Sequence, residues 1–195
     1  MDDDDDIADR AAGPGSSRDA RSTPVVALGA SAGGIQALEA FFQGAPADAG
    51  IAFVVITHLH AGQPTVLGQI LARHTTMAVC EVVEPTLVEP DHVYTSRPGD
   101  HLDLRGETLV PIEATGPAAS HPVDAFFTAL ARERGELAVA IVLSGMGSDG
   151  TLGAQQIKAA LGVVMAQDGS AMHEAMPQSA IDTALVDFVL PPAQM

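Results

Sequence analysis

Basic side chains are scarce in this sequence. Nine of the 195 residues are Lys or Arg, against 25 Asp or Glu, and the formal charge is −16. Proteins bind nucleic acids and anionic lipid surfaces through clustered Lys and Arg, and no three such residues are consecutive here. We therefore expect no nucleic-acid partner and no direct membrane binding.

Cysteine and long apolar runs are also scarce. The single cysteine, Cys80, excludes an intrachain disulfide and fits a reducing cytoplasm. The longest uninterrupted apolar run, residues 137–143, is far shorter than the roughly 18 residues that a membrane-spanning helix needs. The chain opens with Met1 and then five aspartates, unlike the basic start of a secretory signal. We expect a soluble, cytoplasmic protein.

The composition divides the chain into two parts. Residues 1–23 hold seven Asp and three Arg among Gly, Ser, Ala and Pro, with no apolar face to bury, so we expect a disordered acidic tail. Residues 24–195 are rich enough in apolar side chains for one folded domain.

Short apolar runs alternate with helix-like segments throughout the second part. Because the runs are apolar at successive positions, they indicate strands that are buried on both faces, as in a parallel sheet. We predict an α/β fold with a doubly wound, mostly parallel sheet flanked by helices. The expected strands are residues 25–28, 51–56, 77–83, 139–143, 163–166 and 186–190, and the expected helices are residues 35–42, 66–72, 123–132 and 152–160.

The middle of the chain has a different pattern. Residues 92–95, 101–104 and 108–112 alternate polar and apolar side chains between Gly-containing turns. We expect these segments to form a small antiparallel hairpin appended to the main sheet.

Three of the predicted strands end in residues that suit nucleophilic catalysis. Ser31 lies in Gly29-Ala30-Ser31-Ala32-Gly33 between a strand and a helix, His58 follows the second strand, and Asp149 lies in a Gly-rich loop after a later strand. Taken singly, the serine is equally typical of a helix cap, and the histidine and the aspartate are more often a loop histidine and an N-cap. Because the carboxyl ends of parallel strands meet at one edge, together they predict a nucleophile, a base and an orienting acid.

Other site chemistries fit the same residues less well. Dinucleotide binding requires Gly-x-Gly-x-x-Gly and a later acidic residue, but Ser31 replaces the second glycine and the second strand ends in Thr57 and His58. A metal site would need a third ligand beside His58 and His60. We expect no cofactor and no metal.

Several motifs together resemble the catalytic domain of the CheB-type chemotaxis protein-glutamate methylesterases. The resemblance covers about residues 24–195 and implies a doubly wound fold with a Ser, His, Asp triad, carried here by Ser31, His58 and Asp149. Its motifs are Gly29-Ala30-Ser31-Ala32-Gly33-Gly34, Phe53-Val54-Val55-Ile56-Thr57-His58-Leu59, Val88-Glu89-Pro90-Asp91-His92-Val93-Tyr94, Leu143-Ser144-Gly145-Met146-Gly147-Ser148-Asp149-Gly150-Thr151, Ala166-Gln167-Asp168 and Met176-Pro177.

The resemblance also implies an activity and a partner. The expected activity is hydrolysis of glutamate methyl esters, with deamidation of glutamine as a second reaction, on the cytoplasmic helices of methylated chemoreceptors. Amides for the developing oxyanion are expected from the helix start and the later loop, that is, from Ala32, Gly33, Gly145, Met146 and Gly147.

The chain departs from the family pattern at a few positions. Ala32 and Thr57 stand where the family often has Thr and Gln, and Ala175 and Gln178 flank the Met-Pro pair where Gly and Arg are usual. Residues 1–23 are too few for the receiver domain of the family, so we expect no phosphorylation control in this chain. In some relatives a methyltransferase domain follows, and such a signalling domain can belong to a longer native chain.

Two further functions compete with the methylesterase interpretation. A triad specifies the reaction but not the substrate. The chain can therefore be an esterase of the same fold that acts on a different ester or protein substrate. A non-catalytic interaction module on this scaffold is the alternative from another class.

Overall fold

The computed structural model describes residues 22–58, 66–113, 115 and 120–195. Its centre is a sheet of seven parallel strands in the order β10-β9-β8-β1-β2-β5-β3. These strands are β1 (Val25–Ala30), β2 (Ala52–Thr57), β3 (Ala78–Val82), β5 (His92–Ser96), β8 (Val139–Val142), β9 (Val163–Gln167) and β10 (Phe188–Leu190).

The central strands are apolar at successive positions because both faces of the sheet are covered. Along β1, Ala27 contributes to one buried apolar cluster and Leu28 to another. Along β2, Val54 and Val55 divide in the same way. Since successive side chains of a strand point to opposite faces, the two clusters lie on opposite sides of the sheet.

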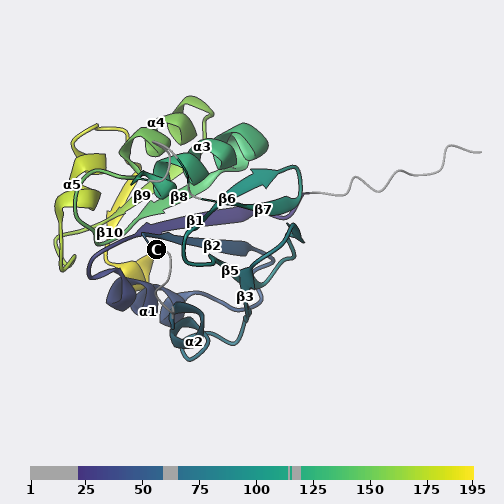
Figure 1. Ribbon diagram of the computed structural model, residues 1–195. Helices are drawn as coiled ribbons and strands as arrows, with labels where there is room; N and C mark the ends of the chain where they lie inside the picture. The colour runs from purple at the N-terminus through teal and green to yellow at the C-terminus, as the bar shows by residue number, and fades with distance from the viewer. Residues whose placement is uncertain (1–21, 59–65, 114, 116–119) are drawn as a thin grey trace, which may run out of the picture.

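Helices cover both faces, which confirms the doubly wound architecture. Figure 1 shows α1 (Gly34–Gly44) and α2 (Leu67–Leu71) below the sheet, and α3 (Pro122–Arg134) and α4 (Thr151–Ala159) above it. The helix α5 (Ala175–Ile181) lies at the left, and its Met176 and Ala180 belong to the buried cluster on the α3 side. The face of α3 that contacts the sheet carries Val123, Phe126, Phe127 and Leu130, all buried, at the i, i+3, i+4, i+7 spacing of an amphipathic helix.

A second, antiparallel sheet packs on the α3 side. Its order is β4-β7-β6, from β4 (Thr86–Leu87), β6 (Asp100–Arg105) and β7 (Thr108–Glu113). Gly106, with a positive φ of 56°, makes the tight turn between β6 and β7. The guanidinium of Arg132 on α3 donates to the carbonyl of Leu104 at 2.7 Å, which holds this sheet against the helix.

One expectation for the middle of the chain was wrong. Residues 92–95 do not belong to the hairpin, because β5 lies inside the main sheet between β2 and β3. The polar side chains of β5 are not exposed to solvent, since Thr95 is buried. The hydroxyl of the buried Tyr94 accepts from the amide of Glu89 and donates to the carbonyl of Leu87. The sequence interpretation also missed β4 and α5.

The connections of the main sheet place the loops after β1, β2, β8 and β9 at one edge. This is the carboxyl edge, where open α/β sheets bind ligands. Among the described residues, no helix is long and apolar enough to cross a membrane.

Candidate active site

The register of the main sheet places Ser31 beside His58. The parallel pairing of β1 with β2 ends at Ala30 and Thr57, and the next residue of each chain segment is the predicted nucleophile or base. Neighbouring strands are about 4.8 Å apart. Ile56 belongs to the cluster on the α3 side, so strand alternation directs His58, two residues later, to that side too.

Asp149 reaches the same place from the loop after β8. Its carboxylate is buried at the N-terminus of α3, where Oδ2 accepts from the Val123 amide at 3.0 Å and Oδ1 accepts from the Asp124 amide at 2.9 Å. The amide of Gly150 also donates to Oδ1, at 2.9 Å. Helix N-termini stabilise anions, so this aspartate is fixed in its ionised form.

The same carboxylate holds the imidazole. Nε2 of His58 lies 3.1 Å from Oδ2 of Asp149 and 3.3 Å from the carbonyl oxygen of Ser120. Both neighbours are acceptors, so Nε2 carries hydrogen. Nδ1 is buried and has no hydrogen-bond partner among the described residues. In the neutral imidazole the basic lone pair is therefore on Nδ1.

The two groups shift each other's titration in opposite directions. The hydrogen bond with Asp149 raises the pKa of His58 above its ordinary value, against the smaller lowering effect of burial. Burial alone would raise the pKa of Asp149, but the hydrogen bonds from His58 and from the amides of Asp124 and Val123 outweigh it and lower that pKa. Near neutral pH, Asp149 is thus an anion that favours a protonated His58.

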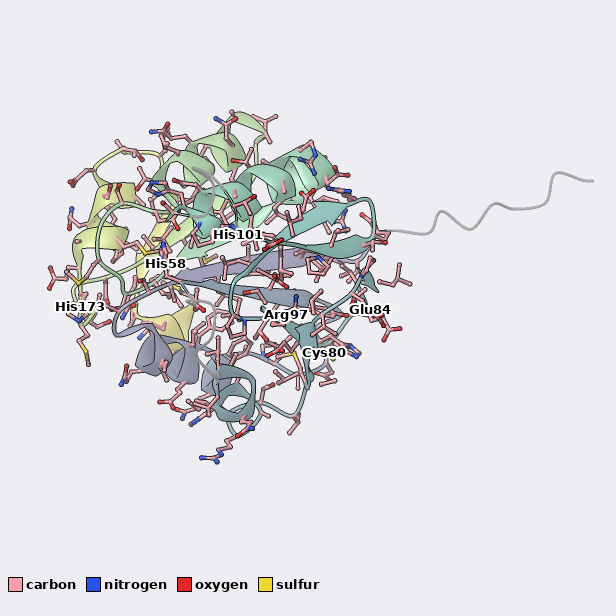
Figure 2. The ribbon with its side chains drawn as sticks, in the orientation of Figure 1. His58, Cys80, Glu84, Arg97, His101 and His173 are labelled. Atoms are coloured by element: carbon pink, nitrogen blue, oxygen red, sulfur yellow. The ribbon has the colours of Figure 1, made fainter. Side chains whose placement is uncertain are left out.

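Ser31 is half-buried at the turn between β1 and α1. The structure joins His58 to Asp149 by a hydrogen bond, but among the described residues no hydrogen bond joins Ser31 to His58. Nucleophile–base hydrogen bonds are often long without substrate. Figure 2 labels His58 toward the left of the molecule, where β1 and β2 end.

The expected oxyanion amides divide into two groups. The Gly145 amide donates to the carbonyl of His173 at 3.0 Å, so it is already engaged. Within the described ranges, the amides of Ala32, Gly33, Met146 and Gly147 have no acceptor.

The engaged amide leaves Gly145 a steric role. A Cβ at this position would lie 3.0 Å from the Cβ of Ser31 and would also overlap Met176. The glycine therefore allows the loop after β8 to approach the Ser31 turn closely, which a larger residue would prevent.

Sequence reasoning missed several groups around the triad candidates. His101 on β6 is half-buried, and burial lowers its pKa, while the charges of Asp149 and His58 also act on it. Ser120 contributes the second acceptor to His58. Both come from segments that the sequence does not connect to the three strand ends, so no local signal could have found them. His60 lies outside the described residues.

His121, Asp124 and Asp149 bring potential metal ligands together. One ligand atom from each lies within 4.8 Å of the others. However, both oxygens of Asp149 accept backbone amides, and Oδ1 of Asp124 accepts the Gly153 amide at 2.7 Å. Amide donors and a helix N-terminus favour anions, so these carboxylates suit hydrogen bonding better than cation binding.

The chain matches the family model described as CheB methylesterase over residues 26–195. The chain belongs to this family. Its fold resembles the crystal structure of the Thermotoga maritima CheB methylesterase catalytic domain, with a TM-score of 0.83 and 28% identity, covering 89% of this chain and 95% of that one.

Curated relatives agree with this membership. A protein-glutamate methylesterase/protein-glutamine glutaminase of Anaeromyxobacter dehalogenans is 33% identical over 89% of this chain and 52% of that protein. One from Xanthomonas oryzae pv. oryzae is 34% identical over 91% and 51%. An uncharacterized 104.1 kDa protein of Rhodobacter capsulatus is 42% identical over 64% of this chain and 13% of its own length. This chain therefore spans about half the length of the methylesterase relatives.

Proposed function

We propose that this chain is a serine esterase that hydrolyses glutamate methyl esters on chemoreceptors, with Ser31, His58 and Asp149 as its triad. The observation that carries the proposal is the orientation of the His58 ring: Nε2 lies 3.1 Å from Asp149, and Nδ1 is buried with no hydrogen-bond partner in the described part of the chain. This arrangement supplies an oriented base beside the Ser31 turn, as acyl transfer by a serine requires.

The proposed reaction has two halves. Ser31 Oγ attacks the ester carbonyl while its proton moves to Nδ1 of His58. The tetrahedral intermediate then expels the methoxy group, which leaves as methanol with the proton from His58. Asp149 stabilises the imidazolium between these transfers, consistent with the raised pKa of His58.

Water completes the cycle. His58 takes a proton from water, the resulting hydroxide attacks the acyl-enzyme carbonyl, and collapse of the intermediate returns the proton to Ser31 and frees glutamate. With glutamine as the substrate, the same steps release ammonia in place of methanol, which matches the glutaminase activity in the names of the relatives.

The oxyanion is proposed to bind at amides with no acceptor among the described residues. We assign the oxyanion donors to the amides of Gly33 and Met146, one from each loop beside Ser31. The amides of Ala32 and Gly147 are their neighbours in sequence and are the further candidates. Removing one such donor typically lowers kcat on the order of 100-fold.

The substrate and the domain boundary are part of the proposal. We assign catalysis to residues 24–195, leave residues 1–23 outside the catalytic domain, and take the cytoplasmic helices of methylated chemoreceptors as the partner. Support comes from the family match over residues 26–195 and from the names of the relatives.

Methanol release from a methylated chemoreceptor fragment tests the proposal. The wild type should release methanol, Ser31→Ala should release none above background, and Ser179→Ala should behave as the wild type. Ser179 is a matched control because its hydroxyl makes a hydrogen bond with Thr151 in the contact between α4 and α5. Methanol release by Ser31→Ala would overturn the assigned nucleophile.

A fluorophosphonate probe separates the chemistry from the substrate. It reacts with activated serines regardless of the natural ester. Labelling of Ser31 without methanol release from receptors would overturn the receptor assignment and indicate an esterase with another substrate. Absence of both would favour a non-catalytic module.

A further inference from the structure

Ser144 connects the segments that surround the candidate nucleophile. It follows β8 and is fully buried, at 0% exposure. Its hydroxyl donates to the carbonyl of Ala32 at 2.9 Å and accepts from the amide of His173 at 3.0 Å. The His173 carbonyl is a more distant second acceptor, at 3.5 Å.

The backbone of Ser144 is held equally firmly. Its carbonyl accepts from the Ser31 amide at 3.0 Å, and its amide donates to Oε1 of Gln167 at 2.9 Å. A side chain on a backbone fixed at both ends can direct its hydroxyl to one place. That place is the carbonyl of the residue after the nucleophile.

The hydrogen bond to Ala32 determines where the Gly33 amide points. In a planar trans peptide, the C=O of one residue and the N–H of the next point in opposite directions. Because the Ala32 carbonyl points toward buried Ser144, the Gly33 N–H points away from it and remains without an acceptor among the described residues. The same rule applies to Met146, since the Gly145 carbonyl accepts from the Met176 amide at 3.0 Å.

Close packing supports the coupling between Ser144 and this peptide. Gly33 has a positive φ of 70°, and a Cβ there would lie 2.9 Å from Oγ of Ser144 and 2.8 Å from the Cβ of Met172. The hydroxyl of Ser144 therefore bonds to Ala32 and leaves no room for a side chain at Gly33, on the other side of the peptide bond.

We propose that Ser144 is a positioning residue, whose hydroxyl fixes the Ala32–Gly33 peptide so that the Gly33 amide serves as an oxyanion donor. The inference rests on the esterase function proposed above and deepens it. Without the hydroxyl, the Ala32 carbonyl loses its buried partner. Since an unpaired buried acceptor is unfavourable, the peptide would rotate, and its carbonyl would take the side to which the Gly33 amide now points, which removes the donor.

Steady-state kinetics on a small soluble ester, p-nitrophenyl acetate, test the role. Ser144→Ala should lower kcat on the order of 100-fold and leave KM within twofold of wild type, because the lost interaction acts in the transition state. Ser144→Thr keeps a hydroxyl and should recover most of kcat, whereas Ser179→Ala should match the wild type. A kcat for Ser144→Ala within threefold of wild type, or a rise in KM alone, would overturn the proposal.

Two measurements keep the test decisive. If Ser144→Ala does not fold, Ser144→Cys supplies a side chain of similar shape whose thiol donates weakly; at an unchanged Tm its kcat should fall at least tenfold, and wild-type kcat would refute the role. A crystal structure of whichever variant folds should show the Ala32–Gly33 peptide rotated or in two orientations. An unchanged Ala32–Gly33 peptide would overturn the inference, whether or not the wild type hydrolyses an ester. A wild type that hydrolyses no ester would contradict only the esterase function.

Discussion

Nε2 of His58 and Oδ2 of Asp149 lie 3.1 Å apart, and the same carboxylate caps the helix that covers this face of the sheet. Two amides from the first turn of α3 and one from Gly150 donate to it. The acid that orients the imidazole is therefore positioned by backbone groups rather than by side chains, and its geometry depends on the packing of α3 against β1 and β2.

Asp149→Asn should be far more damaging than its small change in shape suggests. Oδ1 accepts from two amides, and Oδ2 accepts from one amide and His58. Whichever oxygen becomes NH₂ then faces two donors. We expect kcat to fall by up to about 10⁴-fold, the loss seen when the triad acid becomes an amide, and Tm to fall as well.

Esterase kinetics and thermal melts check this expectation. Asp182→Asn is the matched control, because the Asp182 carboxylate accepts a side-chain hydrogen bond from Gln178 at the exposed end of α5, away from His58. Wild-type kcat in Asp149→Asn would show that the carboxylate does not orient the base.

The pH dependence of activity follows from the raised pKa of His58. Protonated His58 cannot accept the Ser31 proton, so kcat/KM should rise with pH through the pKa of His58. Since the hydrogen bond with Asp149 places that pKa above 6.5, the inflection should lie above 6.5 as well. A pH–rate profile on a small ester measures it, and an inflection below 6.5 would contradict the pairing.

Much of the fold could be predicted because buried parallel strands have a distinctive pattern. The runs at β1, β2 and β8 are apolar at successive positions, and each became a central strand. β5 was misplaced because Tyr94 and Thr95 read as polar positions of a half-exposed strand. Their burial depends on partners elsewhere, such as the Glu89 amide that donates to the Tyr94 hydroxyl, and periodicity carries no record of such partners.

Part of the candidate site could likewise be predicted from the sequence, and part could not. The strand ends that carry Ser31, His58 and Asp149 share one edge of the sheet, as predicted, and the structure joins His58 to Asp149 there. Which imidazole nitrogen holds the proton could not be predicted, because it depends on Asp149 and the Ser120 carbonyl together. Nor could the loss of the Gly145 amide to His173, a contact between two loops that are distant in sequence.

Two histidines follow β2 closely, and only one is predicted to be the base. His58→Ala should abolish ester hydrolysis, and a His58→Ala, Ser31→Ala double variant should be no worse than either single variant, because triad members act as a unit. His60→Ala is the neighbouring control and should retain turnover. The reverse result, with activity in His58→Ala and none in His60→Ala, would move the base to His60.

Deletion of residues 1–23 should leave the catalytic domain intact. These residues carry seven Asp and three Arg and have no apolar face, so their removal should change the free energy of unfolding by no more than about 0.5 kcal/mol. Turnover of a small neutral ester should be unchanged.

The net negative charge of residues 1–23 can act only on the encounter with a large charged partner, through a field that salt screens within about 8 Å. An effect of deletion should therefore appear with receptor fragments alone and fade as salt rises. A full-length variant with Asn at positions 2–6 separates charge from chain length, since it should reproduce part of that effect. A large fall in Tm, or lost activity on the small ester, would place the boundary of the folded domain before Pro24.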